Sequence, residues 1–420
     1  MADSYQLRIN DVQKVGFLFA CILWAFAVDG VVVRADDLLD RLQDKLTFSA
    51  FDDQFRLRLS HVASMEGYAF EEPPAGFVSA ESNALFFPRF TTFVDSQIGS
   101  QIYGFAQFRY DRGFHQGDNP MEWRADAYAL RYTPWDDGRL NLQVGKFGTP
   151  IGNWVPRQHP KDNPFITAPF PYEHRPVIFG ELEDFYFSRM VTQSRNQPYT
   201  YSPVIWGPVY STGAMASGQI QDWTYAFEFK HAPMISRPVD WELSEVQFDH
   251  PTVAGRIGWI PNPMWNLGMN ASKGVYLMNV DQRVLPAGSD ARDFQQTLLG
   301  ADIGFAWHHL QVWGEVYHSR YTDPLVGAAD AYAYYVETKY RFTPRFYGAI
   351  RWNQFISESI YDEFSGRHVP WVSNAWRSDV AVGYRISAHS LLKLQYSFQY
   401  FERGPKSSTQ LIAAQLSVWF

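Results

Sequence analysis

The side chains that could do chemistry in this sequence gather in one segment, residues 145–180, GKFGTPIGNWVPRQHPKDNPFITAPFPYEHRPVIFG. Two histidines, His159 and His174, lie near the carboxylates Asp162 and Glu173, and these residue types could bind a metal or transfer protons. Their spacing matches no motif of a metal site or of an acid–base pair. We therefore predict no metal, no cofactor and no catalysis from this set.

Basic and aromatic side chains give the same segment a second interpretation, as a surface that contacts a small solute. Seven residues would form it: Trp154, Arg157, His159, Lys161, Tyr172, His174 and Arg175. The rings of Trp154 and Tyr172 could stack on an organic solute, or they could pack the segment against its surroundings. The sequence leaves both roles open.

Proline excludes regular structure from this segment. Seven prolines lie between residues 145 and 180, and an eighth follows at 198. Proline donates no backbone hydrogen bond and disfavours helical geometry in the residue before it, so neither a helix nor a central strand can run through. Because its aromatic residues are too many for a disordered linker, we expect a long ordered loop, residues 148–206, and long ordered loops are usually functional.

The rest of the chain is typical of strands. Hydrophobic residues make up 46% of the sequence and aromatic residues 17%, yet the mean hydropathy is −0.28, so apolar and polar residues are interleaved. No stretch after residue 35 approaches the roughly 18 apolar residues of a membrane helix. Alternation predicts sixteen strands, at 55–62, 87–94, 101–110, 124–133, 140–147, 207–217, 221–230, 252–260, 266–276, 297–307, 310–319, 332–342, 346–355, 377–387, 391–401 and 409–420.

The N-terminus differs, because Val15–Val28 is a continuous apolar run behind Arg8 and Lys14. We expect residues 1–35 to be a cleaved signal peptide, cut after residue 27 or 35. An uncleaved helical anchor is the alternative. Cys21, the only cysteine, would be removed, leaving a mature chain without disulfides. The net charge of −8 and the lack of a basic tract argue against a nucleic-acid partner.

The connections between the predicted strands alternate in length. Turns such as 133–139, 261–265, 308–309 and 343–345 are tight, whereas 111–123, 148–206, 231–251, 277–296, 320–331 and 356–376 are long. Short turns at one rim and long loops at the other are typical of a closed outer-membrane barrel. We predict an all-β fold: a short N-terminal segment (36–54) and a single closed antiparallel transmembrane barrel of about 16 strands (55–420). A soluble sandwich would also alternate, but it would not explain the loops or the aromatic residues at strand ends.

One parity of the strands is apolar, as in Trp223, Tyr225, Phe227 and Phe229, and it is expected to face lipid. The other parity would line the lumen, where basic residues outnumber acidic ones. The residues that would form a basic wall are Lys339, Arg341, Arg351, Arg377, Arg385 and Lys393. Rings of Arg and Lys favour anions in pores, although charges of both signs could simply keep water in the lumen.

Two stretches resemble a known family. The final strand, TQLIAAQLSVWF, resembles the C-terminal signal of Gram-negative outer-membrane barrels, which ends in an aromatic residue, here Phe420. LQVGKFGTPIG (142–152) resembles the strand-to-loop segment of the phosphate-selective (O and P type) porins. The resemblance implies a homotrimer in the outer membrane, contact with lipid and lipopolysaccharide, recognition of Phe420 by the barrel-insertion machinery, and a third loop (148–206) folded into the lumen.

Together these features predict a porin that passes small anionic solutes by passive diffusion. Two other classes remain. A barrel could sheath or dock another exported protein, or it could be an outer-membrane enzyme. For the enzyme, the sequence contains no GxSxG motif, and His308-His309 falls in a tight turn.

Overall fold

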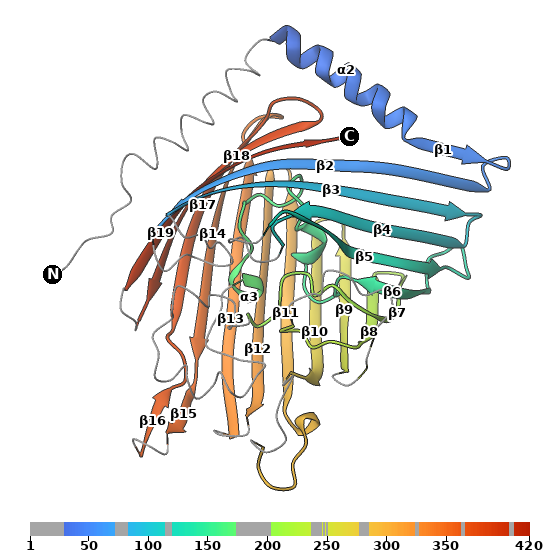
Figure 1. The fold of residues 1–420 in the computed structure, drawn as a ribbon. Helices are drawn as coiled ribbons and strands as arrows, with labels where there is room; N and C mark the ends of the chain where they lie inside the picture. Colours follow the sequence, from blue (N-terminus) through green and yellow to red (C-terminus); the bar gives the residue numbers. More distant parts are fainter. Residues whose placement is uncertain are drawn as a thin grey trace.

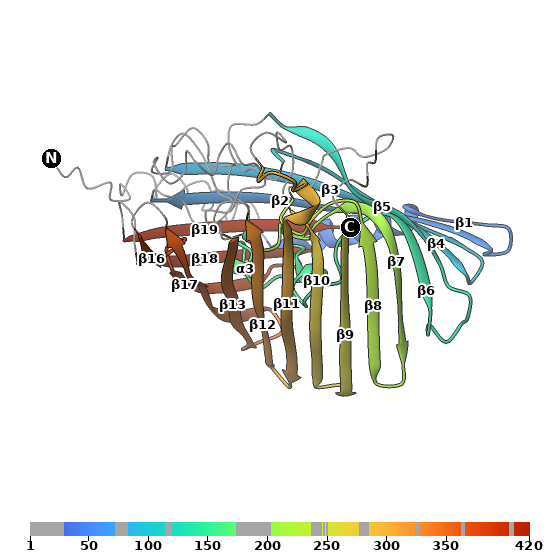
Figure 2. The ribbon, with the colours of Figure 1, turned by 90° about the horizontal axis from the view of Figure 1, so that it is seen from below.

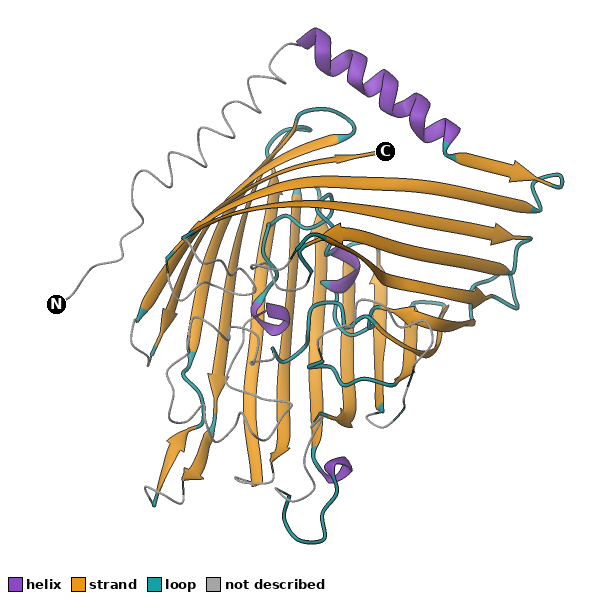
Figure 3. Cartoon of the chain, viewed as in Figure 1, coloured by secondary structure: helices purple, strands orange, loops and turns teal. Residues whose placement is uncertain are grey.

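The computed structural model describes residues 29–71, 83–113, 120–173, 203–236, 246, 248, 251–276, 285–323, 327–362, 366–402 and 407–420. Most of these residues lie in strands, with few helices (Figure 3). The histidine at 174 and the arginine at 175, both predicted to contact solute, lie outside the described residues.

Sixteen antiparallel strands, all those of the main sheet except β1, form one closed barrel (Figures 1 and 2). Each strand pairs with the next along the barrel, and the last, β19, pairs back with β2, so that no edge of the sheet is left open. The strands are β2 (Phe55–Phe70), β3 (Ala84–Ile98), β4 (Ile102–Asp111), β5 (Glu122–Tyr132), β6 (Asn141–Phe147), β7 (Ser211–Ile220), β8 (Trp223–Lys230), β9 (Thr252–Asn262), β10 (Trp265–Val275), β11 (Gln295–Trp307), β12 (Leu310–Asp323), β13 (Gly327–Arg341), β14 (Phe346–Ser357), β17 (Ala375–Arg385), β18 (Ser390–Phe401) and β19 (Ser408–Trp419).

This architecture confirms the predicted barrel and its sixteen strands. Each predicted strand overlaps one observed strand. The first two are longer than predicted: β2 continues to Phe70 and β3 begins at Ala84. Three short strands were not predicted, namely β1 (Thr47–Ala50), which pairs with β2, and the hairpin of β15 (Ser359–Asp362) and β16 (Arg367–Pro370) between β14 and β17.

The outer surface of the barrel is apolar. Phe227, Phe229, Leu394 and Tyr396 are exposed, as the alternation predicts. Exposed apolar side chains recur on every side of the barrel, for example at Val144, Val253, Met269, Leu299, Val336, Ile350 and Val380. Many of the exposed apolar residues near the short turns are aromatic: Trp135, Trp223, Trp259, Trp307, Tyr340, Phe342 and Tyr384. An apolar band bordered by aromatic rings is what a lipid bilayer requires of a barrel surface.

Before the barrel, α2 (Asp29–Lys45) leads into β1. Its residue Asp40 accepts a hydrogen bond from His389 in the short turn before β18, at 2.8 Å. The helix runs across the predicted cleavage position after residue 35, and nothing in the structure tests that prediction. Within the described residues, no helix has the length and apolarity needed to cross a membrane.

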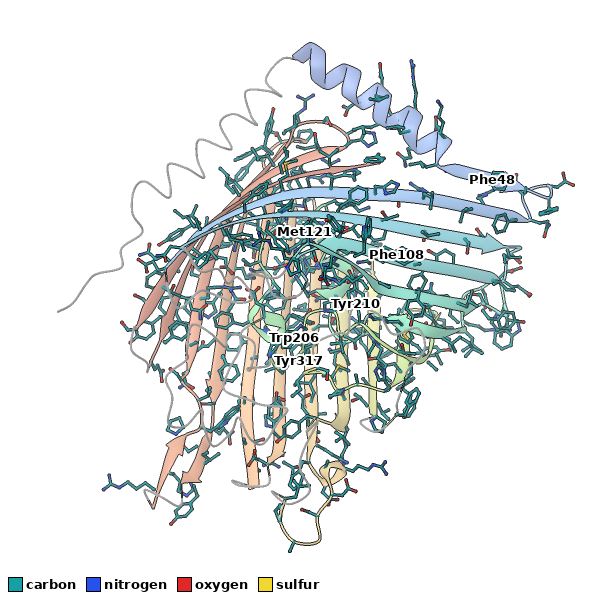
Figure 4. All side chains as sticks on the ribbon, viewed as in Figure 1. Phe48, Phe108, Met121, Trp206, Tyr210 and Tyr317 are labelled. Carbon is teal, nitrogen blue, oxygen red and sulfur yellow. The ribbon has the colours of Figure 1, made fainter. Side chains whose placement is uncertain are left out.

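The opposite parity of the strands carries mainly polar or small residues, with large apolar ones where it packs against protein, and most of it is buried. It is covered by residues 148–173, which contain η1 (Val155–Arg157) and α3 (Phe170–Glu173). α3 lies beside β13 and β14 (Figure 1). Residues of this loop form one buried apolar cluster with the strand residues Leu298, Tyr317, Ala331, Ala333, Tyr335 and Phe355. Figure 4 labels Tyr317, one of the largest fully buried side chains.

Candidate functional site

The loop is held against the wall at three main points of attachment, and the first to be described is the carboxylate of Glu315, on β12. It accepts hydrogen bonds from the backbone amides of Asn153 and Trp154, both at 2.7 Å. The hydroxyls of Tyr172 (2.5 Å), Tyr317 (2.9 Å) and Tyr335 (2.9 Å) also donate to it. Five donors on one buried carboxylate compensate for its desolvation and hold η1 and α3 against β12 and β13.

Glycine is required where the loop passes this carboxylate. Gly152 has φ +74°, and a Cβ there would lie 2.7 Å from Glu315 Oε2 and closer still to the hydroxyls of Tyr172 and Tyr317. Both the backbone conformation and the space therefore exclude a side chain at this position.

A second point of attachment is a group of buried charges on β14 and β17. Arg377 donates to Glu173 of α3 at 2.5 Å and to the carbonyl oxygen of Ala168 at 2.6 Å. Arg351 donates to Thr167 Oγ1 at 2.9 Å and to Asp379 at 2.8 Å. Burial raises the pKa of the Glu173 carboxyl above its usual range, although the Arg377 guanidinium opposes that rise.

β18 supplies the third point of attachment. Lys393 Nζ donates to the carbonyl oxygens of Asn163 (3.0 Å) and Phe165 (3.1 Å). Gln395 Oε1 accepts from the amides of Ile166 (2.6 Å) and Thr167 (3.2 Å). The loop is thus bonded to residues from β12 to β18, all on the inward parity of their strands.

The structure describes five of the seven residues predicted to contact solute. Trp154 and Tyr172 are buried, with ring centroids 4.6 Å apart, so they pack the loop against the wall. Arg157 pairs with Glu337 at 2.6 Å, and its guanidinium lies 4.0 Å from the centroid of the Trp313 ring. These three side chains are occupied by contacts within the protein.

The other two described residues are more accessible. Lys161 is exposed, whereas His159 is half-buried and meets the Phe93 ring edge to face, with centroids 5.1 Å apart. Burial, together with the charge of Arg109, lowers the pKa of His159 to about 3. His159 is therefore neutral at physiological pH.

The predicted basic wall is divided by the loop. Arg351, Arg377 and Lys393 are fully buried beneath it, bonded to loop carbonyls or to carboxylates. The other three residues lie nearer the short turns, and we call Lys339, Arg341 and Arg385 the cationic mouth. Within the described residues none of them forms an ion pair with a carboxylate.

The cationic mouth is accessible to solvent. Arg341 and Arg385 are exposed, and Lys339 is partly exposed, with its Nζ 4.5 Å from the centroid of the Tyr347 ring. Lys339 lies within electrostatic range of Arg341, Arg385 and the loop carboxylate Asp162. The mouth therefore carries three positive charges opposed by one nearby carboxylate.

On the opposite wall the charges neutralise one another. Arg109 pairs with Asp126 (2.5 Å), and Arg124 pairs with both Asp126 (2.8 Å) and Asp111 (2.5 Å). Arg89 bridges Asp111 at 3.1 Å. Arg109, Arg124 and Asp126 all lie on the inward parity of their strands, where alternation alone does not reveal that they pair.

Among the described residues, no group of three or more His, Cys, Asp or Glu side chains could hold a metal ion. His159 and Asp162 belong to the loop, but the fourth member of the set drawn from the sequence, at position 174, lies outside the described residues. The described residues therefore form two features: the points of attachment of the loop, and the cationic mouth.

Comparison by sequence finds no relative: no family model matches this chain, and no curated protein sequence matches it. Comparison by structure finds proteins with the same fold. A loop L8 deletion mutant of OmpT, an outer membrane protein of Vibrio cholerae, covers 88% of this chain with 100% of its own, at a TM-score of 0.55 and 7% identity. The fold is that of an outer-membrane barrel.

Two further structures match equally well. An anion-selective porin from Comamonas acidovorans covers 87% of this chain with 100% of its own (TM-score 0.53, 7% identity). The outer membrane channel DcaP of Acinetobacter baumannii covers 89% of it with 99% of its own (TM-score 0.53, 9% identity). Identities this low establish the fold only. The fold itself, a closed barrel with an apolar belt on its outside, places this chain in an outer membrane.

Proposed function

We propose that this protein is a porin, a passive channel that lets small solutes, preferentially anions, cross the outer membrane. The observation that carries the anion preference is the cationic mouth. Lys339, Arg341 and Arg385 lie on the inward parity of β13 and β17 and form no ion pair with a described carboxylate. Positive charge between walls of low dielectric attracts anions and raises their local concentration.

Residues 148–206 are proposed to narrow the channel. Supporting this, residues 149–173 are bonded to side chains on the inward parity of β8, β10, β12, β14, β17 and β18. A loop attached to so many strands occupies part of the cross-section and limits the size of the solute. Phosphate selectivity and a homotrimeric assembly are suggested only by the resemblance in the sequence, and they stay predictions.

Planar bilayers test the channel itself. The purified full-length chain should give discrete conductance steps, and the reversal potential in a potassium chloride gradient should have the sign of anion selectivity. Potassium phosphate in place of the chloride would test the narrower preference. A bilayer that remains silent would refute the channel and favour a sheath for another protein.

A double variant tests the cationic mouth. Lys339→Gln with Arg341→Gln should shift the reversal potential toward zero without closing the channel. The matched control, Lys273→Gln with Arg320→Gln, removes one lysine and one arginine from the outward parity, where both are exposed, and it should leave the potential unchanged. Equal shifts in the two variants, or cation selectivity of the unmodified protein, would contradict the proposal.

A further inference from the structure

A cavity of 620 Å³ lies between the loop and the wall, at the short-turn end of β8 to β12. The loop contributes Pro150, Gly152, Asn153, Pro156 and Arg157 to its lining. Its volume is that of sites for small organic molecules, which commonly measure about 300–1,000 Å³.

An inward-facing glycine, Gly304, helps to create this space, whereas Gly258 and Gly268 leave room for the side chains of Arg256, Thr224 and Asp302. Gly258 pairs with Gly268 across β9 and β10, and Gly304 on β11 faces Asn266. At Gly304 a Cβ would have only ordinary contacts, with its nearest neighbours, in Asn266 and Trp313, at 3.6 Å. The wall is therefore thin at this point, where a larger residue could have filled the hollow without strain.

Two hydrogen-bond donors in the lining lack an acceptor. Arg256 uses Nε and Nη2 to bind Asp302 (2.9 and 2.7 Å), and Nη2 also reaches Asn266. Its Nη1 donates to no acceptor in the described part of the chain. The hydroxyl of Thr224 is buried, and it too has no hydrogen-bond partner among the described residues. A buried polar atom without a partner costs free energy and calls for an explanation.

These two donors lie close together. A Cβ built at Gly258 would be within 2.6 Å of both Arg256 Nη1 and Thr224 Oγ1. The two atoms are therefore at most about 5 Å apart, a separation that the two oxygens of one carboxylate can span. Asp302, which pairs with Arg256, is not part of the lining, so that the cavity offers the remaining Nη1 of the guanidinium and no carboxylate.

The remaining lining is largely apolar, with Trp313, Pro150, Pro156, Ala226 and Ala306 among its members. Arg157 lies against the Trp313 ring, which holds that ring in place beside the cavity. An aromatic surface next to a guanidinium suits a flat apolar molecule that carries an anionic group.

We infer that this cavity binds an aromatic carboxylate. Its carboxylate would accept from Arg256 Nη1 and Thr224 Oγ1, and its ring would pack against Trp313 and the prolines. The inference rests on the proposed function, because it names a class of solute that the channel would carry. The cavity would then be a binding station at the short-turn end of the route.

Benzoate is the probe, titrated calorimetrically into the full-length chain in detergent and applied separately to single channels in bilayers. Benzoate should bind and reduce the current in a saturable way, whereas acetate, which lacks the ring, and benzyl alcohol, which lacks the charge, should each bind at least tenfold more weakly. Equal binding of acetate or of benzyl alcohol would overturn the aromatic or the anionic half of the assignment.

Three variants test the residues. Arg256→Gln should weaken benzoate binding by about ten- to a hundredfold, the range for losing a hydrogen bond to a charged group. Thr224→Val keeps the shape and should weaken binding about fivefold. Gly304→Val should abolish binding by filling the hollow. Asn270 still donates to Asp302 at 2.8 Å in the arginine variant, which helps it to fold.

The control is Arg320→Gln, since Arg320 binds Asp330 through the same two nitrogens, at 3.2 and 3.0 Å, on the outer face. It should bind benzoate normally. Unchanged affinity in the Arg256 and Thr224 variants would overturn the inference. Normal conductance without benzoate binding would overturn the inference and leave the proposed channel intact. A silent bilayer would refute the channel. Calorimetry measures binding in the cavity in either case.

Discussion

Replacing Arg377 with methionine should release one end of the loop. Arg377 is fully buried and connects three parts of the structure: Glu173 of α3, the carbonyl oxygen of Ala168, and Asp379 beside it on β17. Methionine fills a similar length without charge. Asp379 keeps Arg351 as a partner at 2.8 Å, so the principal loss falls on Glu173.

The size of the loss in free energy depends on how the Glu173 carboxyl responds when Arg377 is removed. Removing one partner of a buried ion pair costs about 3–5 kcal/mol. A carboxyl can limit that cost by taking up a proton. At pH 7, a glutamate with the reference pKa of 4.5 is protonated at a cost of about 3.4 kcal/mol. We therefore expect attachment of the loop to be weakened by about 3 kcal/mol at pH 7.

The same argument predicts how the defect depends on pH. Protonation becomes easier as the pH falls, so between pH 7 and pH 5 the difference between variant and unmodified protein should shrink by up to about 2.7 kcal/mol. Glu173→Gln in the Arg377→Met background removes the titrating group. That double variant should lose the pH dependence of the defect and be less destabilised at pH 7 than the single one.

Hydrogen exchange at the loop amides measures this. The amides of Ile166, Thr167, Ala168 and Phe170 donate to Gln395, Glu173 and Asn353, so they are protected while the loop is attached. After correction for the intrinsic rate, Arg377→Met should speed their exchange at pH 7 by about a hundredfold. Unchanged exchange, or a defect as large at pH 5 as at pH 7, would refute the reasoning.

Two further predictions concern acidity and folding. Because the pKa of His159 is lowered to about 3, attachment of the loop should lose stability as the pH falls from about 6.5 toward 3, by about 2 kcal/mol at pH 5. His159→Gln should remove this part of the pH dependence of hydrogen exchange at the loop amides. The control His308→Gln should not. Gly145→Ala should fold poorly, because φ is +135° and the new Cβ would lie 2.7 Å from Ala129 Cα, whereas Gly304→Ala should fold normally. The shift in gel mobility between unheated and heated samples measures the folded fraction. Equal folded fractions for the Gly145 and Gly304 variants would contradict the steric explanation.

Alternation predicted the strands because the two faces of a closed barrel meet different solvents. On β18, Leu394 and Tyr396 are exposed while Lys393 and Gln395 are buried. The pattern weakens where the inward face packs against protein and apolar residues occupy both faces. That is the case at Tyr68 and Phe70, which lie in a buried cluster, and β2 was predicted to end before them.

β1 shows a limit of a different kind. It pairs with residues 55–58 of β2, whereas the pairing of β19 with β2 stops at Val62. Whether a partner strand is free there depends on the register between the first and last strands, which four residues of local sequence cannot specify. The stretch 142–152 contains Gly145 and Gly152, whose positive φ angles shape the exit from β6 and the approach to Glu315.

The sequence predicted which charged residues face inward, but it did not predict which of them are neutralised by ion pairs. Strand parity placed Arg351 and Arg377 on the inward face correctly, but their partners, Thr167 and Glu173, lie about two hundred residues earlier in the chain. Local sequence carries no record of such pairing. A count of inward charges therefore overestimates the positive field, because each buried pair is neutral as seen from the lumen.

The attachment of the loop also determines which charges of the wall are accessible. While it is attached, Arg351 and Arg377 are neutralised and covered, so that the uncompensated positive charge of this wall is that of the cationic mouth. Releasing the loop would separate Glu173 from Arg377 and uncover positive charge on β14 and β17. If the loop narrows the channel as proposed, Arg377→Gln should reduce selectivity and raise conductance, whereas Glu173→Gln should raise conductance and strengthen anion selectivity, because it frees the arginine instead of removing it. Opposite changes in selectivity with the same change in conductance would separate the electrostatic effect of the loop from its steric effect.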